Sequence, residues 1–146
     1  MAKQTRLRNF FALPSWQRGV LVEAAFRIPL VELGLRTRGL QKIRRKIQKI
    51  PLGSPPISDS GTADQTASRI AGVVSRASHH GVAKGRCLSR SLVLLWILRR
   101  HGIDAELKVG VRQGNEVEGH AWVEYQAKPL NDTADVSQRY EPFPAL

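Results

Sequence analysis

The chain of 146 residues has a single cysteine, Cys87, so it cannot form a disulfide within itself. One unpaired cysteine is typical of a protein from a reducing compartment. Long apolar runs are also missing: the longest, Leu92–Leu98, is far shorter than the roughly 20 residues that span a bilayer. The stretch Phe10–Leu13 is too short to be the apolar region of a secretory signal. These absences predict a soluble, cytoplasmic protein, and the length of 146 residues leaves room for one domain and an appendage.

Acidic residues are scarce in the first 50 residues, which hold 12 Lys and Arg against only Glu23 and Glu32. Residues 51–146 are nearly balanced, with 11 basic and 10 acidic side chains. The net charge of +11 and the pI of about 10.9 therefore describe the N-terminal region. Neither an aromatic platform nor a known binding motif accompanies this charge, so no nucleic-acid partner is expected.

The basic region, residues 1–50, is predicted to form two helices, because apolar residues recur in it at three- and four-residue steps. The first helix is expected from Pro14 with Ser15 as its cap, and Pro29 is expected to kink or split it. Ile43–Ile50 continues a second apolar stripe. One interpretation is a helical hairpin packed on the rest of the chain, with solvated basic residues. The other is a docking surface for an acidic or anionic partner, a peptide or a membrane face.

Residues 51–61 are rich in Pro, Gly and Ser and are predicted to be a linker, which leaves 62–146 as the domain and 1–50 as its appendage. Thr62–Gln65 has the spacing of a capping box for a helix that ends near Ser78. The adjacent pair His79–His80 lacks the spaced partners of a metal site. Neither a metal nor a cofactor is therefore expected.

Cys87 lies where a loop is predicted to give way to an apolar helix. Cations at Arg99–His101 and then Gly102 mark the end of this helix. The free N–H groups at a helix start favour the thiolate form of a cysteine, and the flanking Arg86 and Arg90 act in the same direction. A lone cysteine is also commonly a small buried apolar residue without chemistry. The choice between these interpretations depends on whether a histidine and a carboxylate lie further along the chain, on strands.

After this helix the apolar period changes from 3.6 to 2, which indicates strands. Ile103–Arg112 and His120–Tyr125 are expected to pair across a turn, and Leu130–Asp132 is expected to begin a returning strand. The predicted fold is therefore α+β, with the helix that bears Cys87 packed on a small antiparallel sheet and a helical extension at the N-terminus.

A thiolate that performs nucleophilic catalysis needs an imidazole to carry its proton, and the imidazole needs an acceptor that orients it. His120 and Asp132 are twelve residues apart, so a hairpin can place them side by side. Taken singly, each has an ordinary structural interpretation, but their order after a helix-start cysteine predicts a Cys87–His120–Asp132 triad. Asp135 is a competitor for the carboxylate role; Asp132 is preferred because it lies at the start of the expected returning strand.

Several motifs together resemble one family, the B2 proteins of lasso peptide biosynthesis, which are transglutaminase-like cysteine peptidases. The motifs are Cys-Leu-x-Arg-Ser (Cys87–Ser91), Leu-Arg-Arg-x-Gly-Ile (Leu98–Ile103), Lys-Val-Gly-Val (Lys108–Val111), His-Ala-Trp-Val-Glu (His120–Glu124) and Leu-Asn-Asp (Leu130–Asp132). The resemblance is close from about Ala63 to Tyr140 and looser before it. The loop at residues 79–86 departs from many relatives in lacking a proline.

The resemblance implies a transglutaminase-like or papain-like cysteine peptidase fold and an endopeptidase that removes the leader from a ribosomally made precursor peptide. Cys87 would be the nucleophile, His120 the general base and acid, and Asp132 the orienting acceptor. The backbone N–H of Cys87 is a candidate oxyanion donor. A small leader-binding B1 protein would present the precursor in trans, and an ATP-dependent cyclase is a further candidate partner.

Two other functions are consistent with the same residues. An acyltransferase of the transglutaminase-like superfamily would use the same thioester but resolve it with an amine instead of water. A basic binding module, in contrast, would use residues 1–50 and leave Cys87 unreactive.

Overall fold

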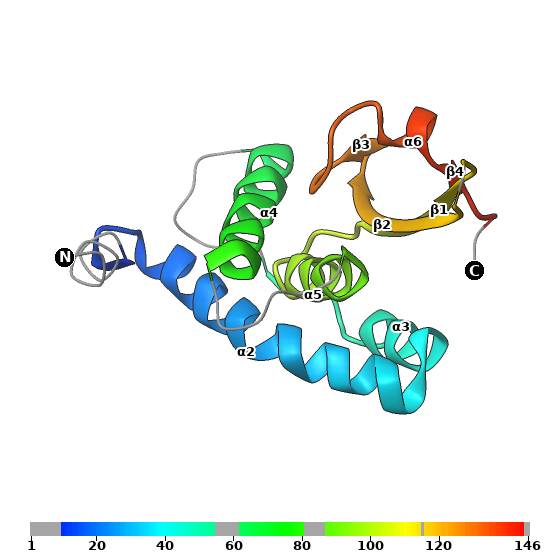
Figure 1. Cartoon of the computed structure of the whole chain (residues 1–146). Coiled ribbons are helices and arrows are strands. Elements are labelled where there is room, and N and C mark those ends of the chain that lie inside the picture. The colour runs from blue at the N-terminus through cyan, green and yellow to red at the C-terminus, as the bar shows by residue number, and fades with distance from the viewer. Residues whose placement is uncertain (1–9, 55–61, 81–86, 115, 145–146) are drawn as a thin grey trace.

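The computed structural model of the chain describes residues 10–54, 62–80, 87–114 and 116–144. Figure 1 shows a layer of helices on one side of the molecule and a strongly curled sheet on the other, with helix α5 between them. The helices are α2 (Ser15–Arg38), α3 (Leu40–Gln48), α4 (Ala63–His80), α5 (Cys87–Arg100) and the single turn α6 (Val136–Arg139). The strands are β1 (Glu106–Arg112), β2 (Glu118–Tyr125), β3 (Lys128–Pro129) and β4 (Glu141–Pro142). The predicted α+β fold is confirmed.

Helix α5 is the central element, because α2, α4 and β2 all pack on it. Its buried residues lie almost all round the helix axis, in agreement with the apolar helix predicted here. The helix runs from Cys87 to Arg100, and the chain leaves it through Gly102, whose φ of 75° is in the left-handed region. The N–H of Gly102 donates to Arg99 and that of Ile103 to Leu98, which is the hydrogen-bond pattern of a Schellman motif. Both predicted ends of this helix are confirmed.

Helix α2 is apolar on two opposite faces. Val20, Ala24, Ile28 and Val31 are buried against α4 and α5. Two residues after each of them stands another large apolar side chain, and two residues turn an α-helix by about 200°. These four side chains therefore lie on the outer face, where they are between 45% and 71% exposed. We call them the α2 stripe: Val22, Phe26, Leu30 and Leu33.

Pro29 was expected to kink or split the first helix, but α2 continues through it. A proline at this position removes the hydrogen bond that would reach the carbonyl of Ala25. Ala25 and Pro29 are both exposed, so water can satisfy that carbonyl. Ser15 is not the cap either: the residue before the helix is Pro14, and Ser15 is its first residue.

The sheet has the order β3–β2–β1–β4, and all its pairs are antiparallel. The central pair runs from Glu106 opposite Glu124 to Arg112 opposite Glu118. Both outer strands are only two residues long and each contains a proline. The expected returning strand at Leu130–Asp132 is wrong, since the strand is Lys128–Pro129 and Asp132 follows it in a bend.

The two faces of β2 serve different cores. Val123 faces α5 and joins the main core formed by α2 to α5. Trp122 lies on the other face and packs in a smaller cluster with Val136 and Tyr140. His120 precedes Trp122 by two residues and therefore shares its face. The strand that carries the histidine thus has a sheltered face on each side.

The N-terminal helices are part of the main core, because Ile43 and Ile47 of α3 and the buried face of α2 belong to it. The Thr62 hydroxyl accepts a bond from the N–H of Gln65 at 3.4 Å, which is one of the two bonds of the predicted capping box. The linker predicted at 51–61 lies mostly outside the described residues, and the domain boundaries stay predictions. Within the described part of the chain, no helix is long and apolar enough to cross a membrane.

Candidate active site

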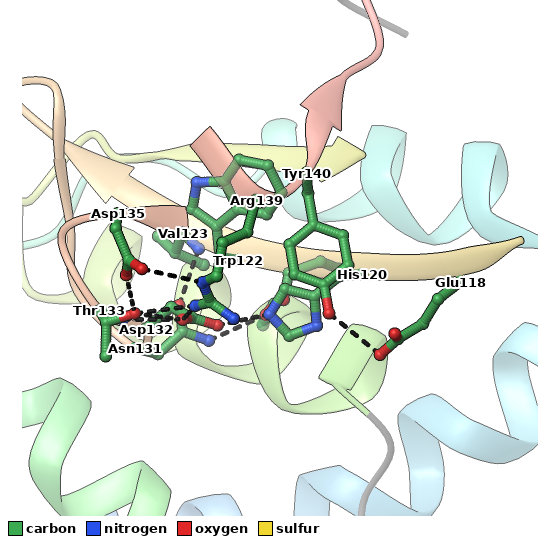
Figure 2. A network of polar contacts seen from close by, with 12 residues as sticks. Glu118, His120, Trp122, Val123, Asn131, Asp132, Thr133, Asp135, Arg139 and Tyr140 are labelled. Carbon is green, nitrogen blue, oxygen red and sulfur yellow. Dashed lines mark hydrogen bonds and ion pairs between the residues drawn. The ribbon is translucent and has the colours of Figure 1, made fainter. Parts of the chain in front are cut away.

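A hydrogen bond between His120 and Asp132 is the centre of the candidate site. It joins Nε2 of the imidazole to Oδ2 of the carboxylate, and both side chains are mostly buried. Strand β2 positions the histidine, while the bend after β3 brings the aspartate back beside it (Figure 2). With Nε2 engaged by the carboxylate, Nδ1 is the ring nitrogen that remains to exchange a proton with another group.

The second oxygen of Asp132 is held just as firmly. Oδ1 accepts from the backbone N–H of Thr133 at 2.7 Å and from the guanidinium of Arg139 at 2.8 Å. Burial opposes ionisation of this carboxyl. The bonds from His120 and Thr133 and the charge of Arg139 outweigh burial and lower the pKa of Asp132. The carboxylate is therefore charged at neutral pH and its orientation is fixed on both sides.

The imidazole is also held by ring packing. The ring of Tyr140 stacks on it with centroids 4.7 Å apart, and the ring of Trp122 lies 6.1 Å away (Figure 2). The Tyr140 hydroxyl donates to Glu118 at 3.0 Å, and Trp122 donates its indole N–H to Glu124 at 2.7 Å. These bonds fix both aromatic rings, which in turn restrict the imidazole to one plane.

Cys87 is a free, half-buried cysteine at the first position of α5. One turn further along this helix, the hydroxyl of Ser91 donates to the carbonyl of Ala121 at 2.9 Å. Ala121 is the residue next to His120, and the rise from Cys87 to Ser91 is only about 6 Å along the helix axis. The start of α5 therefore lies in the neighbourhood of the His120–Asp132 pair. Within the described residues, no hydrogen bond joins the thiol to the imidazole, and such bonds commonly tighten only when substrate is present.

Asp132 and Asp135, the two candidates for the carboxylate, have different partners. Asp135 accepts from the Thr133 hydroxyl and pairs with Arg139 at 3.2 Å, and it does not contact His120. Of the two, Asp132 is therefore the one that bonds the imidazole, and it does so without lying at the start of a strand as expected.

Sequence reasoning gave no role to four residues that support the site, namely Ser91, Asn131, Arg139 and Tyr140. Ser91 and Asn131 are within the Cys-Leu-x-Arg-Ser and Leu-Asn-Asp motifs, and their short distances from Cys87 and Asp132 in the sequence could have indicated that they lie near the site. Ser91 follows Cys87 by one helical turn, and Asn131 precedes Asp132 directly. Arg139 and Tyr140 gave no comparable signal, because they come from the segment after the predicted strands.

No group of three or more His, Cys, Asp or Glu side chains suited to a metal ion occurs among the described residues. The side chains of His79–His80 and the loop 81–86, including Arg86, lie outside that part of the chain. A half-buried thiol at a helix start, near an imidazole that a carboxylate orients, can support acyl transfer through a thioester.

Comparison with known families identifies the class to which this fold and site belong. A family model described as the transglutaminase-like superfamily matches residues 27–145. The chain therefore belongs to the transglutaminase-like superfamily, which contains cysteine peptidases and acyltransferases. The match begins within α2, so it includes half of this helix and all of α3. Searches of curated proteins and of solved structures give no match to this chain.

Proposed function

We propose that this protein is a cysteine endopeptidase that removes the leader from a ribosomally made, lasso-type precursor peptide. The observation that carries the proposal is the imidazole–carboxylate pair of His120 and Asp132, held near the start of the helix that bears the only cysteine. Membership of the transglutaminase-like superfamily supports thiol chemistry at such a site. The lasso assignment itself rests on the motifs at Cys87–Ser91, His120–Glu124 and Leu130–Asp132.

In the proposed reaction, Nδ1 of His120 accepts the proton of the Cys87 thiol, and the sulfur attacks the carbonyl carbon of the scissile bond. The imidazolium then protonates the leaving amine, the C–N bond breaks, and a thioester to Cys87 remains. Water loses a proton to Nδ1 as it attacks the thioester, and the thiolate leaves. Asp132 bonds Nε2 throughout, so it holds Nδ1 toward the sulfur and stabilises the imidazolium.

Leader recognition is proposed to come from a small separate partner protein. The α2 stripe supports this, because a contiguous row of large exposed apolar side chains on one helix is typical of an interaction surface. Basic residues follow the stripe along α2 and α3, and no acidic residue interrupts them between Glu32 and Gln48. This surface suits a partner that offers apolar and acidic side chains. The ATP-dependent cyclase that would receive the freed core peptide is a further proposed partner.

The test is to incubate the purified chain with its precursor and the leader-binding protein and to analyse the products by mass spectrometry. A single cut into two fragments is expected, and Cys87→Ala should abolish it. A cross-linked product without hydrolysis would identify an acyltransferase. Full cleavage by Cys87→Ala would refute the proposal altogether.

A further inference from the structure

Strand β3 lies beside only the last two residues of β2, so next to the candidate site this edge of β2 has no neighbouring strand within the described residues. Strand β3 ends at Pro129, and the last backbone bond on this edge runs from the N–H of Leu130 to the carbonyl of Val123 at 2.8 Å. Beyond this point the N–H of Val123 and the carbonyl of Ala121 face the same edge, since residues two apart in a strand point their polar groups the same way. Buried backbone groups without partners are costly, so something else must bond them.

Two side chains take the place of the missing strand. The amide oxygen of Asn131 accepts from the N–H of Val123 at 2.8 Å, and the hydroxyl of Ser91 donates to the carbonyl of Ala121 at 2.9 Å. The Asn131 amide nitrogen then donates to the Ser91 hydroxyl, also at 2.9 Å. We call this chain of three bonds the Ser91–Asn131 relay.

The direction of every bond in the relay is fixed. The Val123 N–H can only donate, so the oxygen of the Asn131 amide must face it and the NH₂ group must face Ser91. The Ser91 oxygen accepts this bond, which leaves its own proton for the Ala121 carbonyl. Ser91 is fully buried, so water does not compete for these groups. One arrangement of the relay therefore satisfies every group in it.

Three residues of the relay are close in sequence to the three residues of the proposed triad. Ser91 lies one helical turn after Cys87, Ala121 directly follows His120, and Asn131 directly precedes Asp132. The relay thus joins the helix, the strand and the bend that carry the three groups. We propose that Ser91 and Asn131 are positioning residues that keep the start of α5 in register with the His120–Asp132 pair. This inference rests on the proposed thiol chemistry, but it concerns residues that the proposed reaction does not use.

A neighbouring serine provides a matched control. Ser89 is also fully buried in α5, but its hydroxyl donates to Glu32 of α2 at 3.2 Å, away from the sheet. Ser89→Ala and Ser91→Ala each remove one buried hydroxyl from the same helix, so both should lower stability to a similar degree. Only Ser91→Ala should disturb the placement of the start of α5 relative to the His120–Asp132 pair.

The experiment measures the alkylation rate of Cys87 by iodoacetamide against pH in the folded protein. A thiolate paired with an imidazolium reacts in mildly acidic solution, where a free thiol hardly reacts. We expect the wild type and Ser89→Ala to be reactive at about pH 6, and Ser91→Ala and Asn131→Ala to be at least about tenfold slower, because one mispositioned hydrogen bond is worth roughly that factor. Ser91→Thr keeps the hydroxyl and should recover much of the rate. The double variant should be no slower than the slower single one, since both act through one relay.

The outcomes separate the two proposals. If the wild type is unreactive near pH 6, the proposed thiol chemistry fails and the positioning role fails with it. If the wild type is reactive and both relay variants keep its rate and pH profile, the positioning role is refuted while the proposed function stands. If Ser91→Ala fails to fold, circular dichroism will show it, and the half-exposed Asn131→Ala decides the result by the same criterion.

Discussion

Asp132→Asn replaces one carboxylate oxygen by an NH₂ group and leaves the shape of the side chain unchanged. In the wild type three donors face this carboxylate: the Nε2–H of His120 on one side, and the Thr133 N–H and Arg139 guanidinium on the other. An amide has only one acceptor oxygen, so it cannot serve both sides. Two donors and a positive charge favour placing the oxygen toward Thr133 and Arg139, which turns the NH₂ group toward His120.

That orientation would force the wrong tautomer on the imidazole. Nε2 would have to accept from the new amide, so the proton would move to Nδ1, the nitrogen that should receive the proton of the thiol. Losing the proton carrier together with the charge that stabilises the imidazolium removes general acid–base catalysis, a term usually worth about 10² to 10⁴ in rate. We therefore expect Asp132→Asn to lower kcat by about 10² to 10⁴, with little change in KM.

Precursor cleavage, followed by mass spectrometry under single-turnover conditions, measures this loss. Asp135→Asn is the matched control: it also faces Thr133 and Arg139 but does not touch His120, so it should keep activity within about threefold. An Asp132→Asn protein that folds and cleaves as fast as Asp135→Asn would show that the carboxylate does not orient the imidazole.

Three further predictions rest on described contacts. The hydrogen bonds of Asp132 and the charge of Arg139 lower its pKa against the opposing effect of burial. Its negative charge therefore stabilises the fold above about pH 4, and this stabilisation is lost as the pH falls through the lowered pKa. The free energies of unfolding of wild type and Asp132→Asn, measured in urea, should accordingly converge in acid. Gly53→Ala should destabilise the folded protein by about 1–3 kcal/mol or more, since the added Cβ would lie 1.7 Å from a backbone oxygen. Gly72→Ala, at an open helical position, should stabilise the folded protein by about 0.5–1 kcal/mol. Equal shifts of the two unfolding curves would contradict this prediction. Phe26→Asp in the α2 stripe should slow partner-dependent cleavage by at least about tenfold without changing the alkylation rate of Cys87. Leu52→Asp, at another exposed apolar position, should change neither the cleavage rate nor the alkylation rate.

The helix that bears Cys87 could be predicted in detail because its signals are local. Its apolar spacing, the cations at Arg99 and Arg100 and the exit at Gly102 each depend on a few neighbouring residues. The two long strands were predictable for the same reason, since alternation is a local pattern, although the first begins at Glu106, three residues later than expected.

The surroundings of His120 and Asp132 could be predicted only in part. Spacing predicted that they would meet, and they do. It could not show that side chains replace a strand where β3 ends, because a two-residue strand leaves no alternation to detect. The contacts of Tyr140 and Arg139 depend on how the chain folds back after β3, which no local pattern encodes. The continuity of α2 through Pro29 likewise depends on exposure, which the sequence alone does not reveal.

Both margins of the sheet are formed by very short strands that contain proline. Each outer strand has two residues, one of them a proline without an N–H group, and beyond β3 the N–H of Val123 and the carbonyl of Ala121 are already bonded by side chains. At the β3 margin another polypeptide therefore finds few free backbone groups against which to add itself as an extra strand. This arrangement guards a small, basic protein against edge-to-edge aggregation. An extra strand would gain few backbone bonds beside β3, so a partner at this margin has more to gain from recognising side chains than from extending the sheet.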